Sequence, residues 1–198
     1  MTFLPILSYN NDDRKHWLHI EQRMKRTKFF IRVNKDTVRK SKKNGLTVRY
    51  DINYKDLNSP GVYAIRFLDE KGKTRTAAVG SNSSANKNSV RTRVYRFALE
   101  YAHLSKNNGG YPAARHMRNH YPFEDGDFKF SVHFISRKDV EKIVPYNFKD
   151  ISLKMKYVEL LFFENMNPEY TTRKHILHSI RNKKKCTIKP DRNVYDYV

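Results

Sequence analysis

The chain has little of what characterises several classes of protein. It has one cysteine, Cys186, in 198 residues, which excludes an intramolecular disulfide and is typical of a reducing compartment. It has no low-complexity tract and no internal repeat, so a repeat architecture is not expected. No apolar run approaches the length of a membrane span, and Met1–Leu7 is short and lacks the charged start of a signal peptide. These absences predict a soluble cytoplasmic protein with no membrane partner, and leave an anionic membrane surface as the weaker alternative target.

Acidic residues are also scarce. Asp and Glu number 20 against 40 Lys and Arg, which gives a formal net charge of +20. Residues 1–57 carry 14 Lys and Arg against 6 Asp and Glu, and residues 172–198 carry 8 against 2. A field of this sign attracts a polyanion, and basic segments at both ends suit a protein that holds a phosphate backbone. A hydrophobic content of 38% is sufficient for a folded core, so wholesale disorder is not expected.

Hydrophobic periodicity predicts an α+β domain over residues 58–171. Its expected elements are strands at residues 60–68, 74–80 and 127–136 and helices at residues 90–104 and 148–165. The first two strands are separated by turn residues, which favours an antiparallel hairpin. We therefore expect a small three-stranded antiparallel sheet flanked by helices. Residues 106–118 are expected to be an insertion, a loop or a helix, that contributes contacts to DNA bases.

The two flanks are expected to be additions to this domain. Residues 12–28 are predicted to be a helix, because acidic residues come first and basic residues last, as the helix macrodipole favours. A second short helix is expected to end at Gly45, and residues 46–52 are expected to be a strand or an extended lead-in. Residues 1–57 are thus predicted to be a basic, helical, DNA-binding extension, and residues 172–198 a basic C-terminal tail.

One carboxylate, Glu159, lies inside the apolar run "YVELLFFENMNPEY" of residues 157–170. A charged group removed from water costs several kcal/mol unless it finds a partner. Three explanations are open at this point: an ion pair with Lys156 or Arg93, a solvated helix face, or a functional role.

Four short elements follow one another along the predicted domain. Gly61-Val62-Tyr63 begins the first strand, and Val79-Gly80 closes the second. Arg93 lies on the next helix within "VRTRVYRF", and Glu159 lies nine residues before Pro168-Glu169-Tyr170. In this order and on these elements, the four resemble the motifs of the GIY-YIG nuclease family. The resemblance covers about residues 60–171 and leaves both flanks unassigned.

This resemblance implies a Mg²⁺-dependent (or Mn²⁺-dependent), site-specific DNA endonuclease of the restriction, homing or mobile-element-conflict type, encoded by a bacterium, a phage or another mobile element. It implies that Tyr63 orients or activates the attacking water, that Arg93 stabilises charge on the phosphoryl oxygens and that Glu159 holds the metal. The residue types suit these roles, since Mg²⁺ takes one or two protein carboxylates and a guanidinium offers a planar fork of donors. One active site cuts one strand, so the enzyme would be a nickase, or would cleave both strands by successive nicks or as a homodimer on DNA.

The chain departs from the family pattern at three positions. Ala78 stands where the second motif has tyrosine, Phe97 where the family usually has tyrosine or histidine, and Thr171 where it has asparagine. The candidates to supply supporting groups in their place are Lys87, Tyr95 and His103. The alternative is a catalytically inactive, sequence-specific DNA-binding protein on the same scaffold, in which Tyr63 is a core aromatic and Arg93 coats a solvated helix face. An HNH-type nuclease or an RNA-binding protein is less well supported, because the sequence has no His-centred metal pattern and no RNA-stacking motif.

The expected partner is double-stranded DNA, held by basic residues of the flanks and of the domain. The predicted contacts are Arg23, Arg26, Lys40, Lys42 and Lys43 in the N-terminal flank, Arg91, Arg96 and Arg115 in the domain, and Lys183, Lys184 and Lys185 in the tail.

Overall fold

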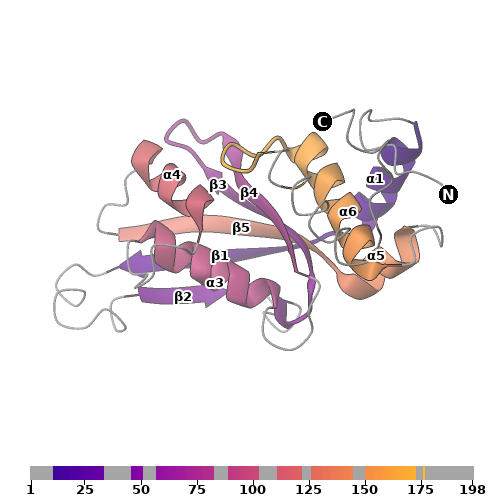
Figure 1. Cartoon of the computed structure of the whole chain (residues 1–198). Coiled ribbons are helices and arrows are strands. Elements are labelled where there is room, and N and C mark those ends of the chain that lie inside the picture. The colour runs from indigo at the N-terminus through magenta and orange to yellow at the C-terminus, as the bar shows by residue number, and fades with distance from the viewer. Residues whose placement is uncertain are drawn as a thin grey trace, which may run out of the picture.

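The structure, a computed structural model, describes residues 11–33, 46–50, 57–82, 89–102, 111–121, 126–144, 150–172 and 176. These residues form an α+β fold of five helices and one five-stranded sheet (Figure 1). In chain order the elements are α1 (Asn11–Arg23), β1 (Lys25–Val33), β2 (Leu46–Tyr50), β3 (Gly61–Leu68), β4 (Thr74–Asn82), α3 (Val90–Tyr101), α4 (Pro112–His120), β5 (Gly126–Ser136), α5 (Arg137–Ile143) and α6 (Ile151–Met166). None of the described helices is long and apolar enough to cross a membrane.

The sheet has the strand order β2-β1-β5-β3-β4, and every neighbouring pair is antiparallel. The expectation of three strands was wrong, because β1 pairs with the edge of β5 that the small domain would have left free. This pairing runs from Lys25 opposite Phe134 to Val33 opposite Gly126, and β2 then adds to β1. The sheet therefore contains strands from both sides of residue 57, at which the sequence predicted the boundary between the N-terminal extension and the domain.

The N-terminal segment shows why β1 was missed. The sequence predicted one helix over residues 12–28, but α1 ends at Arg23 and β1 begins at Lys25. Within β1, Thr27 and Phe29 are buried and the lysine between them is exposed, which is the period of two of a half-buried strand. The basic residues hid this alternation because they equally suit the C-terminal end of a helix.

The other elements were largely predicted, with two differences. The part of residues 106–118 that the structure describes forms α4, so the helical alternative holds there. The short helix α5 was not predicted; Ser136 caps it by accepting a hydrogen bond from the Asp139 N–H. The helix expected to end at Gly45 lies outside the described residues.

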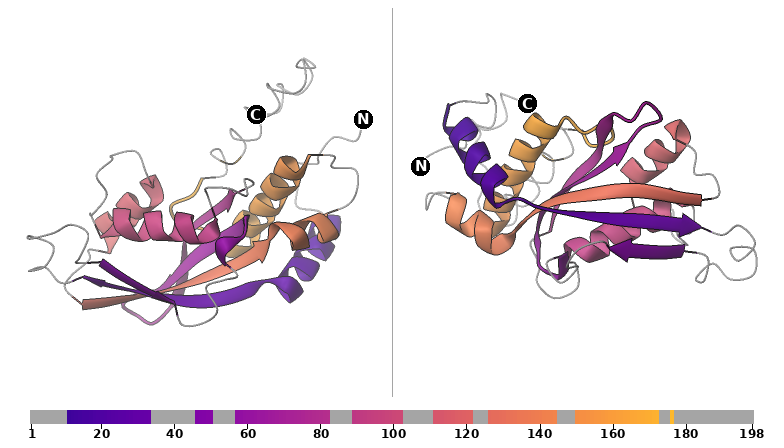
Figure 2. Two further views of the ribbon diagram at one scale, coloured as in Figure 1. Left: turned by 90° about the horizontal axis from the view of Figure 1, so that it is seen from below. Right: turned by 180° about the vertical axis from the view of Figure 1, so that it is seen from behind.

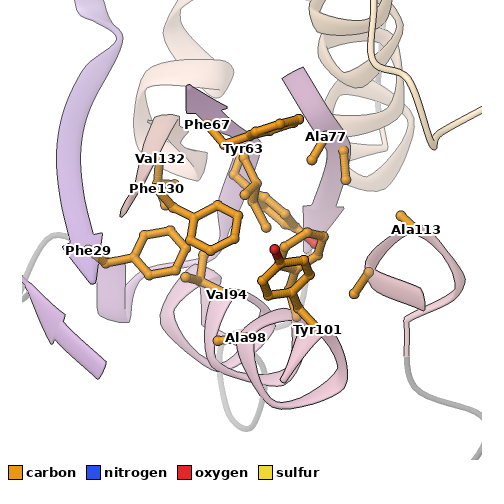
Figure 3. Close-up of a cluster of buried hydrophobic side chains, with 14 of the residues drawn as sticks. Phe29, Tyr63, Phe67, Ala77, Val94, Ala98, Tyr101, Ala113, Phe130 and Val132 are labelled. Atoms are coloured by element: carbon orange, nitrogen blue, oxygen red, sulfur yellow. The ribbon is translucent and has the colours of Figure 1, made fainter. Parts of the chain in front are cut away.

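Alternation along β3 decides which helices cover each face of the sheet. Tyr63 and Phe67 point to the face covered by α3 and α4, where they join one aromatic core (Figure 3). Phe29 and Phe130 stack in the same core, with ring centroids 4.9 Å apart, and so tie the added strand β1 to it. Val62 points to the opposite face, where residues of α1, α5 and α6 form a second core.

The segment after α6 runs along the outer edge of β4. Asn167 adopts a left-handed conformation with φ 44° and ends α6. The backbone N–H groups of Glu169 and Tyr170 then donate to the carbonyl oxygens of Thr76, at 2.9 Å, and of Ala77, at 3.1 Å. This segment satisfies backbone groups that an edge strand would otherwise present to solvent.

The described helices cover the second face of the sheet only at one end. Figure 2 shows α1, α5 and α6 gathered at that end, while β1 and β5 run clear of them toward the other. Arg26 lies opposite His133 across β1 and β5. Two residues further along, Ser131 lies opposite Lys28 on one side and Arg66 on the other. Because residues directly opposite one another share a face, these side chains belong to the uncovered part of the sheet.

His133 gives this face a pH dependence. Its side chain is 7% exposed, and burial together with the charges of Arg66 and Arg26 lowers its pKa from 6.5 to about 4. Between these values the unfolded chain binds more protons, so stability is fully present above about pH 6.5 and falls by roughly 3 kcal/mol toward pH 4. We expect His133→Gln to flatten the decline in the free energy of unfolding over this range, measured by urea titration. A decline as steep as that of the wild type would contradict this.

Candidate active site

Tyr63 lies in the first core, opposite Gly80 on the neighbouring strand. A Cβ atom at Gly80 would lie 2.6 Å from the Tyr63 hydroxyl oxygen and 2.8 Å from its Cζ, so the phenol occupies the space that a side chain would need. A Cβ at Gly61 would lie 2.3 Å from the carbonyl oxygen of Ile135, so β3 and β5 approach closely there. Gly80 is therefore required by packing against Tyr63, and Gly61 by the close approach of β3 to the backbone of β5.

Gly80→Ala is expected to lower the free energy of unfolding by about 2 kcal/mol, since overpacking a tight core typically costs 1–3 kcal/mol. The added methyl group can fit only if the buried Tyr63 ring moves. In a Tyr63→Leu background, which lacks the obstructing atoms, the same substitution is expected to cost about 1 kcal/mol less. Chemical denaturation of the wild type, Gly80→Ala, Tyr63→Leu and the double variant measures this coupling. If Gly80→Ala lowers the free energy of unfolding equally in both backgrounds, Tyr63 is not the obstacle.

A second tyrosine, Tyr111, meets Tyr63 inside this site. The two hydroxyl groups are hydrogen-bonded to each other. Tyr111 is the N-cap residue of α4, and its ring packs edge-on against Phe97 of α3, with centroids 5.9 Å apart. Tyr63 is 3% exposed whereas Tyr111 is only partly buried, so Tyr111 is the phenol that solvent can reach more easily.

The surroundings keep both phenols protonated. Burial raises the pKa of Tyr63 well above its usual value of 10, and its interaction with Tyr111 raises it further. Burial also raises the pKa of Tyr111, while the hydrogen bond with Tyr63 and the charge of Arg93 act in the opposite direction. The negative charge of Glu159 adds to the rise in both pKa values. In the free protein, then, neither hydroxyl is a base at neutral pH, and both can orient a neighbouring group by hydrogen bonding.

Arg93 lies in the first turn of α3, where Ser89 caps the helix by accepting from the Thr92 N–H. Its guanidinium lowers the pKa of Tyr111 through its charge and a hydrogen bond. Its Nε is buried and has no hydrogen-bond partner within the described residues. An unsatisfied buried donor costs about 1–3 kcal/mol, so a group left in this state calls for an explanation such as a bound ligand.

Glu159 lies on α6 with 2% of its surface exposed. Lys156, one turn earlier on the helix, pairs with it at 2.5 Å between Nζ and Oε2. The ion pair that the sequence left open as one explanation of this carboxylate is therefore present. The charge of Glu159 also acts on Tyr63 and Tyr111, where it adds to the rise that burial causes in the pKa of both phenols.

The carboxylate of Glu159 is the group of this site that can hold a divalent cation. Lys156 bonds to Oε2, which leaves Oε1 as a ligand atom. Within the described part of the chain, no group of three or more His, Cys, Asp and Glu side chains is placed to hold a metal ion. One carboxylate fits Mg²⁺, which takes one or two from a protein and completes its shell with waters and substrate phosphate, better than it fits Zn²⁺, which takes three or four protein ligands.

The second phenol of the site comes from the start of α4. Ala78 is buried in the core that Tyr63 and Tyr111 share, and the Tyr111 hydroxyl meets that of Tyr63 there. Phe97 of α3 packs against the Tyr111 ring. Tyr111 was not among the predicted site residues. Its only local signal is a tyrosine directly before Pro112, the first residue of a short helix, and that does not point to a site.

Thr171, the third departure from the family pattern, closes the segment along β4. Its hydroxyl oxygen accepts a hydrogen bond from the Val79 N–H at 3.1 Å. Val79 directly precedes Gly80, so Thr171 holds the strand at the point where the Tyr63 phenol lies against it.

The other predicted site residues that the structure describes are exposed or pair with other groups. Tyr95 is 45% exposed and lies two positions after Arg93, about 200° further around the helix. Among the predicted DNA contacts, Arg23, Arg26, Arg91 and Arg96 are exposed, and Arg115 pairs with the buried Glu100 at 3.4 Å. The remaining ones, Lys87, His103, Lys40, Lys42, Lys43, Lys183, Lys184 and Lys185, lie outside the described residues.

Comparison with protein-family models, with curated proteins and with solved structures found no match to this chain.

Proposed function

We propose that the chain is a Mg²⁺-dependent, site-specific DNA endonuclease of the GIY-YIG type. The observation that supports this proposal is that the charges of Arg93 on α3 and of Glu159 on α6 both act on the phenol of Tyr63 on β3. These are the three residues on which the family resemblance places catalysis. The net charge of +20 supports a polyanionic substrate.

The phenols are assigned to positioning. Tyr111, the more accessible of the two, orients the attacking water, and Tyr63 holds Tyr111 in place through the hydrogen bond between their hydroxyls. Both hydroxyls stay protonated in the free protein, so this role does not require either to remove a proton. The water oxygen loses a proton to solvent and forms a bond to phosphorus, one P–O bond to a sugar breaks, and the departing oxygen gains a proton from solvent.

Arg93 is assigned to the charge that develops during this displacement. Its unpaired Nε can donate to a non-bridging phosphoryl oxygen, and such a donor inside a site with little water stabilises the transition state strongly. Glu159 would hold the cation, and a bound Mg²⁺ ion would polarise the phosphoryl oxygen as a Lewis acid. Lys156 fixes the carboxylate through Oε2.

The second candidate function is a catalytically inactive DNA-binding protein on this scaffold. The observation in its favour is the Lys156–Glu159 ion pair, which gives the buried carboxylate a structural partner. Such a protein would retain the basic surfaces and bind DNA without cutting it.

The test is incubation of supercoiled plasmid with the purified protein, in Mg²⁺ and in EDTA. The proposed enzyme converts the plasmid to open circles or discrete linear fragments only in Mg²⁺. A Glu159→Gln preparation purified in the same way controls for a contaminating nuclease. Binding of DNA by both proteins without cleavage in Mg²⁺ or Mn²⁺ would favour the inactive DNA-binding protein.

A further inference from the structure

The uncovered part of the second sheet face is strongly basic. We call it the basic sheet face; its residues are Arg26 and Lys28 of β1, Arg66 of β3, and Lys129 and His133 of β5. Arg26, Lys28 and Lys129 are exposed, Arg66 is partly buried and His133 is buried. Side chains on one face repeat about every 7 Å along a strand, and neighbouring strands are about 5 Å apart, so the charges lie close together.

Within the strand segments whose side chains the structure describes, no acidic side chain balances this charge. The strand segments whose side chains the structure describes, residues 25–30, 61–68, 74–82 and 128–136, contain no Asp and no Glu. The basic groups also act on one another: beside the larger effect of burial, the charge of Arg26 lowers the pKa of Arg66, and the charges of Arg66 and Arg26 lower the pKa of His133. Like charges placed side by side on a sheet destabilise it, so the arrangement costs stability in the absence of an anion.

Two buried polar atoms of this face also lack partners. The Nε of Arg66 and the Nδ1 of His133 have no hydrogen bond within the described residues. They lie on the adjacent strands β3 and β5, two residues apart in register, since Ala64 and not Arg66 is opposite His133. A guanidinium donor and an imidazole nitrogen left unsatisfied among exposed lysines suit a phosphate group that would bond to them.

We propose that the basic sheet face binds the phosphate backbone of a second DNA segment. Tyr63 points to the opposite face of the sheet, beneath α3 and α4, so the two surfaces lie on opposite sides of the β layer. A straight duplex cannot contact both. DNA matches the face because it carries one charge per about 1.7 Å of its axis. The binding of a first DNA segment as the substrate, on the side of Tyr63, rests on the proposed function. The binding of DNA at the basic sheet face does not depend on that function.

The first experiment measures how binding to a labelled DNA duplex of about 30 base pairs depends on salt, in EDTA so that no cleavage occurs. Each phosphate contact contributes about 0.9 to the slope of log K against log salt, so Lys28→Ser/Lys129→Ser is expected to lower the slope by nearly 2. Both lysines are exposed, so the fold should tolerate the change. The control is Lys71→Ser/Lys142→Ser, which removes the same charge from the exposed β3–β4 turn and α5 and is expected to leave the slope almost unchanged.

The second experiment tests for two DNA segments on one protein. A biotinylated duplex on beads is expected to capture a fluorescent duplex through the wild-type protein and through the Lys71/Lys142 variant, and the Lys28/Lys129 variant is expected to lower this capture at least tenfold. Equal slopes and equal capture for the two double variants would overturn the proposal. So would an effect of Lys28/Lys129 confined to RNA or to anionic vesicles. Plasmid nicking is measured separately. If the protein does not cut DNA, the salt dependence and the capture experiment still test whether the basic sheet face binds DNA.

Discussion

Replacing Glu159 by glutamine is expected to lower the rate of Mg²⁺-dependent plasmid nicking by at least about 1000-fold. The carboxylate is the one described group of the site that can hold the cation, and a bound metal contributes several kcal/mol of transition-state stabilisation, at 1.36 kcal/mol per factor of ten in rate. Because glutamine keeps the shape of the side chain, DNA affinity in EDTA should change little. Single-turnover nicking with protein in excess, beside fluorescence anisotropy in EDTA, separates the two effects.

The ion pair of Glu159 requires a control for folding. Glu159→Gln leaves Lys156 without its partner, and removal of one member of a buried pair can destabilise a protein by 3–5 kcal/mol. Lys156→Met/Glu159→Gln removes both charges. Its free energy of unfolding, measured in urea, should be closer to that of the wild type than that of Glu159→Gln is, while the variant remains inactive. Glu100→Gln is the matched control, since Glu100 is 5% exposed, lies on α3 and pairs with Arg115, so this variant also removes one member of an ion pair. A double variant that folds and nicks at the wild-type rate would contradict a role for Glu159 in catalysis.

Arg93→Lys is expected to slow nicking by about 100-fold or more, the typical cost of removing one preorganised donor to a developing charge. Lysine keeps the positive charge but not the planar fork or the Nε donor, so the loss should appear in the single-turnover rate rather than in DNA affinity. Arg96→Lys, an exposed position one turn later on the same helix, should change the rate less than about threefold. The proposed role of Arg93 fails if both variants lose activity equally or if Arg93→Lys nicks nearly as fast as the wild type.

The paired tyrosines change how the missing motif tyrosine should be understood. At Ala78 the sequence shows only the loss of a hydroxyl, and on that basis an inactive protein gains support. The structure places the hydroxyl of Tyr111 against that of Tyr63, and Phe97 against the Tyr111 ring. A second phenol therefore reaches the site from α4, a helix that is far from the second motif in the sequence. Ala78 and Phe97, the two positions that lack the expected hydroxyl or imidazole groups, lie in the same core as this pair of tyrosines.

The sequence by itself was sufficient for features that depend on local periodicity and composition. The alternation of residues 60–68 and 74–80, the helical spacing of residues 90–104 and the excess of positive charge each follow from neighbouring residues, and the α+β class follows from their order. It was also sufficient to mark Glu159 as a carboxylate that needs a partner, because an apolar helix does not solvate a charge.

Only the tertiary structure decided which distant segments meet. β1 reads as the basic end of a helix until it pairs with β5, about 100 residues later, and that pairing creates both the five-stranded sheet and the basic sheet face. The hydrogen bond between Tyr63 and Tyr111 likewise joins a strand to the start of a helix, and no hydrophobic periodicity in the sequence connects the two. Strand pairing and side-chain meetings of this kind depend on how the whole chain packs, and the local preferences that a sequence displays do not contain that information.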